Sequence, residues 1–184
     1  MLKKLTRNDY PLVSNLMSDP VDHEKICGNA FAYPISEAQY NEYFVTNAGD
    51  ENRRLCFKYS RGGQWLGIAN FTRIDRKNDY GHIGLVAIDP SIRGSGYGET
   101  MLIELLHKGF DELGFNRIDL VVIESNRGGY QFYTNKIGFT DEGLIRDIIK
   151  VNGSYLSWHS LSMLRADWAN KALQGTQASC TPEL

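Results

Sequence analysis

Apolar side chains near the N-terminus recur every three or four residues, the spacing that places them on one face of a helix. Two such stretches occur, and each begins behind a residue that can cap a helix, Thr6 in the first and Ser36 in the second. The pattern therefore predicts that two helices open the chain. Their apolar positions are Leu12, Val13, Leu16 and Met17, and then Tyr40, Tyr43 and Phe44.

The next part of the chain is predicted to form strands. Residues 55–60 and 65–74 flank the turn Arg61-Gly62-Gly63, which predicts a β-hairpin with a glycine-containing loop. Residues 80–88 are a further run of strand-forming side chains. We therefore expect three consecutive strands.

A long amphipathic helix follows, and its apolar face stops at Leu113 beside Gly114. The order expected after it is a strand over residues 117–124, a short helix over 127–136, and a hairpin of strands 144–151 and 155–163 around Asn152-Gly153. The succession of elements predicts a mixed α/β (α+β) domain.

Length and composition limit the architecture and the partners. A chain of 184 residues fits one domain, which we expect to span residues 1–168, followed by a small, polar and flexible tail over 169–184. The net charge of -2 produces no general field for nucleic acid or an anionic membrane, so neither is expected as a partner. Three distant cysteines without a C-x-x-C pair predict no metal site. Together with the lack of a signal-peptide pattern, they predict a cytoplasmic protein.

The most informative segment is the turn before the long helix. It reads Arg93-Gly94-Ser95-Gly96-Tyr97-Gly98 and follows the predicted strand 80–88. Alternate glycines allow close approach of a ligand, and the first turn of a helix presents unpaired N–H groups, so the segment predicts a diphosphate site. A dinucleotide fingerprint needs G-x-G-x-x-G and a Walker loop needs Gly-Lys-Ser or Gly-Lys-Thr, and the chain has neither.

Three residues of this turn carry a resemblance to a known family. Arg93, Gly96 and Gly98 match the form Q/R-x-x-G-x-G/A, and the chain resembles the GCN5-related N-acetyltransferase (GNAT) superfamily. Asn126 and Tyr133 stand where that family shows Asn and Tyr, whereas Gly129 replaces its usual Ala. The C-terminal part is similar to the branch of ribosomal-protein N-terminal acetyltransferases, with polyamine acetyltransferases nearby.

The resemblance implies a fold, a co-substrate and the residues that bind it. The implied fold is a mixed sheet of about six to seven strands flanked by about four helices. Acetyl-CoA is the implied co-substrate, with no metal. The backbone of Val86 and Ile88 would hold the pantetheine arm, and Asn126 would lie near the reactive end. The diphosphate would be held by Arg93, Gly94, Ser95, Gly96, Tyr97 and Gly98.

The implied reaction is attack of a primary amine on the thioester. Tyr133 is the candidate that stabilises the departing thiolate. Full proton donation from a tyrosine of pKa ~10 to a thiolate of pKa ~8.5 is uphill by about 2 kcal/mol, so a hydrogen bond and a full transfer both stay open. Glu124 at a strand end and His82 on the preceding strand are the candidates for the base, and water alone is the third option.

The acceptor stays open at this stage between a protein N-terminus, a polyamine and an amino sugar. Four aromatic residues of the N-terminal part and the last hairpin either line its slot or belong to the core: Tyr33, Tyr40, Tyr43 and Trp158. Acidic residues between positions 19 and 37 either favour a cationic acceptor or form a solvated face. A silent acyl-CoA-binding domain is the main alternative function, a nucleotide oxidoreductase is a remote one, and a homodimer through the C-terminal strands is the candidate assembly.

Overall fold

A computed structural model describes residues 1–27, 30–46, 53–151 and 153–178. The described part is built on a seven-stranded sheet with the order β1-β2-β3-β4-β5-β7-β6. Neighbouring strands are antiparallel except β4 and β5, which are parallel. The strands are β1 Leu2–Lys4, β2 Leu55–Arg61, β3 Gln64–Asp75, β4 Tyr80–Ile88, β5 Arg117–Ile123, β6 Thr140–Val151 and β7 Ser154–Leu164.

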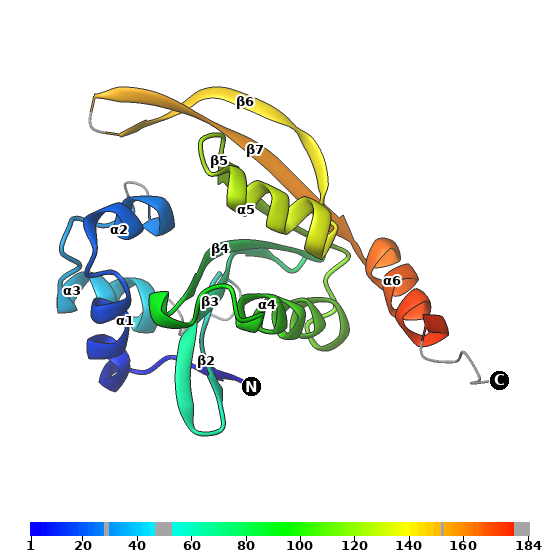
Figure 1. Cartoon of the computed structure of the whole chain (residues 1–184), viewed down its shortest axis with the longest axis horizontal. Helices are drawn as coiled ribbons and strands as arrows, with labels where there is room; N and C mark the ends of the chain where they lie inside the picture. The colour runs from blue at the N-terminus through cyan, green and yellow to red at the C-terminus, as the bar shows by residue number, and fades with distance from the viewer. Residues whose placement is uncertain (28–29, 47–52, 152, 179–184) are drawn as a thin grey trace.

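Helices pack on both faces of this sheet. The N-terminal helices gather at one side of β2 to β4, while α4 lies against the sheet from another side (Figure 1). Three π-helical segments of the described part extend α3, α4 and α5: Asn41–Thr46, Lys108–Glu112 and Phe132–Ile137. The helices are α1 Tyr10–Leu16, α2 Pro20–Cys27, α3 Glu37–Tyr40, α4 Tyr97–His107, α5 Arg127–Gln131 and α6 Arg165–Ala178.

The apolar patterns in the sequence become two cores. The first joins the sheet to α4, whose Met101, Leu102, Leu105 and Leu106 are fully buried. The second joins the other face of the sheet to the N-terminal helices through residues such as Val13. Helices cover both faces, and β3 is buried without interruption from Leu66 to Thr72. The apolar run Leu120-Val121-Val122-Ile123 predicts that β5 is also buried on both faces, but buried and half-buried residues alternate along β5, so that expectation is wrong.

The mixed α/β fold and the order of the main elements are confirmed, and three elements were missed. Strand β1 has only three residues and pairs with β2, and α2 has a weak apolar face, so neither produced a clear pattern. Helix α6 continues to Ala178, where the sequence predicted a flexible tail from residue 169. Residues 179–184 lie outside the described part. None of the described helices is both long and apolar enough to cross a bilayer.

The separation of β4 from β5 creates room inside the fold. The two strands pair only from Tyr80–Arg117 to His82–Asp119. Beyond that point β5 remains paired with β7 as far as Ile123, while β4 continues to Ile88 beside β3. Two parallel strands that pair at one end and diverge at the other leave a wedge between them. The long hairpin of β6 and β7 arches over this side of the molecule (Figure 1).

Candidate active site

The glycine-rich turn adopts the conformation that an anion site requires. Gly94 and Gly96 have φ values of 80° and 84°, in the left-handed region that favours glycine. Gly96 is the N-cap of α4, and the first helical bond runs from the N–H of Thr100 to the carbonyl of Gly96 at 3.1 Å. The N–H groups of Tyr97, Gly98 and Glu99, in the first turn of α4, therefore have no partner within the helix. They point outward at the positive end of the helix dipole.

The last residues of β4 present backbone groups to the wedge. The N–H of Leu85 donates to Oδ1 of Asn70 at 2.7 Å, and that of Asp89 donates to the carbonyl of Leu66 at 2.9 Å, both on the β3 side. Successive residues of a strand direct their N–H groups to opposite edges. The N–H groups of Val86 and Ile88 therefore face the side where β5 has separated.

A cavity of about 520 Å³ occupies this wedge. Its walls come from β4, β5, the turn before α4, the beginning of α5, helix α2 and the terminal hairpin. It brings together six of the residues expected from the sequence to form the site: His82, Val86, Ile88, Arg93, Asn126 and Tyr133. Of the turn at residues 93–98, only Arg93 lines the cavity, and residues 94–98 lie outside the lining. The open edge of β4 and the first residue of the turn thus meet at one cavity.

Tyr133 lies in this cavity with its ring packed among aromatic neighbours. The ring centroids of Phe132 and Phe139 are 5.3 Å and 6.1 Å away. Burial raises the pKa of Tyr133 to about 12. The hydroxyl therefore stays protonated over the whole physiological range and can act as a hydrogen-bond donor.

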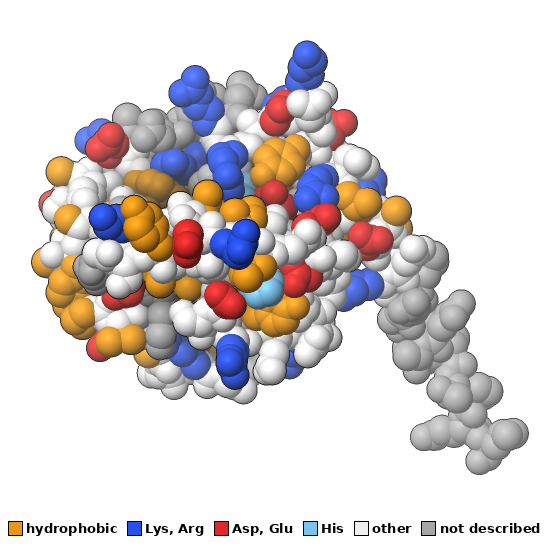
Figure 2. Space-filling model, turned by 90° about the horizontal axis from the view of Figure 1, so that it is seen from above, with side chains coloured by type: hydrophobic (Ala, Val, Ile, Leu, Met, Phe, Trp, Pro, Cys, Tyr) orange, Lys and Arg blue, Asp and Glu red, His pale blue; other side chains and the backbone are white. Residues whose placement is uncertain are grey.

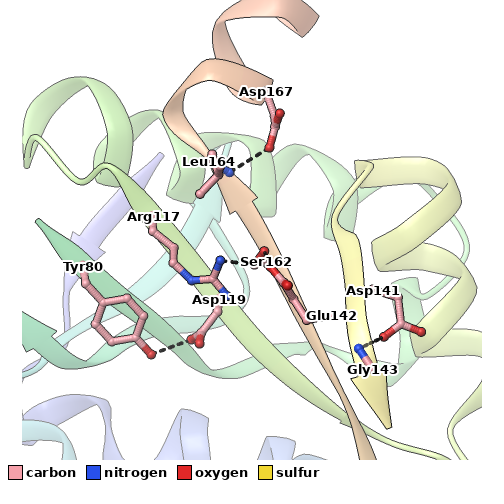
Figure 3. Close-up of polar contacts among 9 residues, drawn as sticks. All are labelled: Tyr80, Arg117, Asp119, Asp141, Glu142, Gly143, Ser162, Leu164 and Asp167. Atoms are coloured by element: carbon pink, nitrogen blue, oxygen red, sulfur yellow. Dashed lines mark hydrogen bonds and ion pairs between the residues drawn. The ribbon is translucent and has the colours of Figure 1, made fainter. Parts of the chain in front are cut away.

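His82 is buried and oriented by a carboxylate that sequence reasoning missed. Its Nδ1 lies 2.6 Å from Oδ1 of Asp119. Figure 3 shows the second contact of this oxygen, which accepts a hydrogen bond from the hydroxyl of Tyr80 at 2.7 Å. Burial alone would raise the pKa of Asp119, but the hydrogen bonds from His82 and Tyr80 outweigh it and the pKa is lowered. An ionised carboxylate at Nδ1 favours the tautomer whose Nε2 accepts a proton.

Known proteins provide independent information about this site. The model of the acetyltransferase (GNAT) family matches residues 20–139, a segment that contains the turn, both wedge strands and Tyr133. The chain belongs to the GNAT acetyltransferase family. It is an N-acetyltransferase with the GNAT fold.

Relatives and solved structures agree with that assignment. The chain is 29% identical over 170 residues to the uncharacterized N-acetyltransferase p20 of Bacillus licheniformis, covering 91% of this chain and 94% of that protein. It is 30% identical over 103 residues to an uncharacterized prophage-derived N-acetyltransferase, YokL, of Bacillus subtilis strain 168, or 56% of this chain and 57% of that one. A spermidine N-acetyltransferase from Vibrio cholerae in complex with CoA and spermine superimposes with a TM-score of 0.79 at 21% identity. That match covers 92% of this chain and 98% of the other.

One departure from the GNAT pattern has a local explanation. Asn126 caps α5, because its Oδ1 accepts a hydrogen bond from the N–H of Gly129 at 3.0 Å. A Cβ atom at position 129 would lie 2.6 Å from Nδ2 of Asn126. Glycine therefore lets the amide of Asn126 fold back over the first turn of α5 while its Nδ2 remains a donor.

The second candidate base lies elsewhere in this acetyltransferase. Glu124 follows β5 and lines a separate cavity of about 450 Å³ with Ser125, Arg127, Tyr130 and His159. The structure therefore brings His82 and Tyr133 to one cavity and leaves Glu124 outside it.

The four aromatic residues considered for the acceptor slot lie in three different environments. Tyr43 and Trp158 line the cavity in the wedge. Tyr40 is fully buried and donates to the carbonyl of Thr6 at 2.6 Å, so it belongs to the core. Tyr33 is 49% exposed and donates to the carbonyl of Ser18 at 2.6 Å.

Proposed function

We propose that this protein moves the acetyl group of acetyl-CoA to a primary amine by direct attack. The observation that carries the proposal is the meeting of the open edge of β4 with Arg93 at one cavity, directly before the left-handed Gly94 and Gly96. Such an edge fits an extended amide-bearing arm, and the N-terminus of α4 fits a diphosphate. When bound, acetyl-CoA supplies the thioester carbonyl that the amine attacks.

We assign the binding of acetyl-CoA to the residues of that edge and turn. Val86 and Ile88 would bind the pantetheine arm through their backbone groups, and Asn126 would donate from Nδ2 near its reactive end. The segment from Arg93 to Gly98 would bind the diphosphate through its N–H groups.

The side chains of the cavity support separate catalytic roles for His82, Asp119 and Tyr133. His82 would take the proton from the attacking amine through Nε2, with Asp119 as the positioning residue behind it. As the new C–N bond forms and the C–S bond breaks, a backbone N–H of β4 would stabilise the oxyanion. Tyr133 would donate a hydrogen bond to the departing sulfur. Full transfer from a phenol of pKa about 12 to a thiolate of pKa ~8.5 is uphill by about 5 kcal/mol, which favours the hydrogen bond.

Two measurements on the purified chain test the function. Calorimetric titration with acetyl-CoA should release heat and give one binding site per chain, and free thiol should appear when peptides, polyamines and amino sugars are added. No heat on titration would contradict the proposal. Binding without thiol release from any amine would instead favour a silent acyl-CoA-binding domain, against which the presence of Tyr133 and Asn126 in one cavity argues. Thermal-shift titration tests the remote alternative of an oxidoreductase, because NAD rather than acetyl-CoA would then raise the melting temperature.

A second copy of the chain is our proposal for the partner of β6. This strand lies at the edge of the sheet, and its residues from Thr140 to Ile148 are exposed. Leu144, Ile145 and Ile148 are 41%, 43% and 48% exposed. Hydrophobic side chains lie open among charged ones on the face seen from above, where the hairpin lies (Figure 2). Open apolar edge strands pair readily with another copy of themselves.

The cellular compartment and the acceptor amine follow from separate arguments. We infer that the enzyme acts in the cytoplasm, where a thiol such as that of the buried free Cys56 remains reduced. The similarity to ribosomal-protein N-terminal acetyltransferases favours an α-amine as acceptor. An α-amine of pKa ~8 also needs far less deprotonation than a lysine of pKa ~10.4.

A further inference from the structure

The end of the cavity remote from the glycine turn contains two arginines. Thr72 pairs with His82 across β3 and β4, and Arg73 follows Thr72. Arg54 precedes Leu55, which pairs with Phe71, so Arg54 reaches the same level of the sheet. Both arginines line the cavity.

These arginines are too far from the glycine turn to serve the diphosphate. Ile88, next to the turn, lies six positions after His82 along β4. A strand rises ~3.3 Å per residue, which gives about 20 Å. Arg93 already lies at the diphosphate end. The two arginines at the level of His82 therefore lie where the acceptor must be held.

Arg54 is held in place with an unused donor. Its guanidinium stacks on the ring of Tyr43 with 3.6 Å between Cζ and the ring centroid, and its Nη1 donates to the carbonyl of Tyr43 at 3.0 Å. Phe31 packs edge-on against the same ring at 4.7 Å. Nε of Arg54 is buried and has no hydrogen-bond partner among the described residues. A guanidinium oriented in this way is ready to bind an oxygen of a ligand.

Arg73 is directed into the cavity by an irregular strand. Its φ of 47° is left-handed, which is uncommon for a residue other than glycine, and it lies in a bulge between Thr72 and Asp75. Consecutive side chains of a regular strand point to opposite faces, yet Thr72 and Arg73 both line the cavity. Its charge also helps to lower the pKa of Asp119, which places it beside the pair of Asp119 and His82.

The remaining polar groups of the wall favour an anion as well. None of the described residues that line the cavity is an aspartate or glutamate. Asp119 stands behind His82 and is bound by it and by Tyr80. Nε1 of Trp158 is a second buried wall donor without a partner in the described part. Asp19, Glu24 and Glu37, considered earlier as attractors of a cation, are exposed and lie outside the lining.

We infer that the acceptor is a primary amine that also carries a carboxylate, as amino acids and acidic peptides do. This inference rests on the proposed acetyl transfer and specifies its substrate. Arg54 and Arg73 bind the carboxylate, and the amine then faces Nε2 of His82. The same positive charges favour the neutral form of the amine, which is the form that attacks. A polyamine, whose charges are all positive, is repelled from this end of the cavity.

Matched acceptors that differ only in charge test the inference. Thiol release from acetyl-CoA is measured with alanine against alaninamide, with the dipeptide amide Ala-Glu against Ala-Gln, and with spermidine. We expect the carboxylate form of at least one pair to have a kcat/KM about 10- to 100-fold above its amide, and above spermidine. Equal use of both forms in both pairs, or preference for spermidine, overturns the inference while acetyl transfer stands.

Variants then connect the preference to the two arginines. Arg54→Gln and Arg73→Gln should each reduce the ratio of kcat/KM within the preferred pair about tenfold or more, with unchanged affinity for acetyl-CoA. Arg54→Lys, which keeps the charge, should retain part of the ratio. Arg61→Gln, at the exposed opposite end of β2, is the control and should change nothing. If both glutamine variants melt like the parent and keep the ratio, the inference is wrong. Acetyl-CoA binding without thiol release from any acceptor would instead count against the proposed function itself.

Discussion

Asp119 determines how His82 can act. Both residues lie inside the fold, their side chains 2.6 Å apart, and the hydroxyl of Tyr80 holds the same carboxylate oxygen. The lowered pKa of Asp119 keeps it ionised at neutral pH. A fixed negative charge behind an imidazole orients the ring and stabilises the protonated form that arises when the amine is deprotonated.

Asparagine at position 119 should therefore lower turnover without affecting the binding of acetyl-CoA. We expect Asp119→Asn to reduce kcat about 10- to 100-fold, measured by thiol release, with an unchanged calorimetric Kd, and Asp119→Glu to restore part of the rate. Asp111 offers a matched control, because it forms a similar pair with His107 at 2.7 Å on the surface. Equal turnover of Asp119→Asn and the parent would remove the positioning role.

Tyr133 should affect the chemical step alone. Tyr133→Phe removes the hydroxyl proposed to donate to the departing sulfur and is expected to lower kcat about 10- to 1000-fold, with little change in acetyl-CoA affinity. Tyr155→Phe, at a side chain that is 62% exposed, is the control. An unchanged turnover number would exclude the role.

The pH profile tests the state of the same hydroxyl. A tyrosine with a pKa of about 12 remains protonated when the pH rises from 8 to 10, whereas an ordinary one begins to ionise there. The turnover of the parent and that of Tyr133→Phe should therefore change with pH in the same way between pH 8 and pH 10. A decline near pH 10 that only the parent shows would contradict the raised pKa.

At the scale of elements, the junction between β4 and α4 is the proposed diphosphate site. The strand ends at Ile88, a short 3-10 turn follows over Pro90–Ile92, and α4 begins at Tyr97. Between them Gly94 and Gly96 adopt left-handed conformations, and Gly96 is the N-cap from which α4 starts. The proposed diphosphate site needs both the left-handed conformation of the glycines and the position of α4 after β4.

A substitution that strains this junction should weaken acetyl-CoA binding. Gly96→Ala forces a side chain into the left-handed region at a cost of about 1 kcal/mol and should raise the calorimetric Kd about tenfold. Gly63, with a φ of 80° in the turn between β2 and β3, provides the matched control. Gly63→Ala should lose similar stability and keep the Kd. If both variants bind acetyl-CoA like the parent, the turn is not the diphosphate site.

At the scale of the whole molecule, buried carboxylates connect distant parts of the chain. Asp9, before α1, lies 2.7 Å from Nζ of Lys58 on β2 and also accepts from the backbone and hydroxyl of Thr6. Burial opposes ionisation of Asp9, but these hydrogen bonds lower its pKa overall. The N-terminal segment is thereby fixed to the sheet whose other face carries α4.

Acid should destabilise the molecule through these groups. The pKa values of Asp9 and Asp119 are lowered in the folded state, so the unfolded chain binds more protons near pH 4. Their contribution is present above an unfolded pKa of ~3.9 and is lost as the pH falls through the folded values. Melting temperature should decline between pH 5 and pH 3, and less steeply in Asp9→Asn. An equal slope in both proteins would contradict this.

The proposed pairing of β6 with a second copy also belongs to this scale. Ile148→Asp puts a charge on the exposed apolar edge and should convert a dimer to monomers in sedimentation velocity. Val21→Asp, at a side chain that is 58% exposed on α2, is the control and should remain dimeric. A monomeric parent at micromolar concentration would exclude the dimer.

The parts of the fold that the sequence predicted correctly have strong local patterns. The helix with Met101 and Leu105 and the hairpin around Gly62 and Gly63 follow from spacing and turn residues alone. Strand β1 was missed because three residues show no period, and it exists only through its pairing with β2. Helix α6 was missed because its polar composition resembles that of a tail.

The candidate site divides in the same way. The glycine turn could be found from the sequence, because alternate glycines directly before a helical pattern indicate a turn that needs left-handed conformations. Gly94 and Gly96 adopt them. Asp119 could not, because it lies 37 residues from His82 in the chain and meets it only through the register of β4 and β5. The one signal for Asp119 in the sequence is its place on a predicted strand beside apolar neighbours. No local pattern, however, indicates which strand will lie next to that of Asp119.

By itself, the sequence of this protein determined its alternation of helices and strands and the turn at residues 93–98, because periodicity and glycine conformation depend on near neighbours. Only the tertiary structure decided that β4 and β5 separate beyond His82, that Glu124 faces a different cavity from Tyr133, and that Arg54 and Arg73 stand beside His82. Those outcomes depend on strand order, register and a bulge, which arise when distant segments pack together.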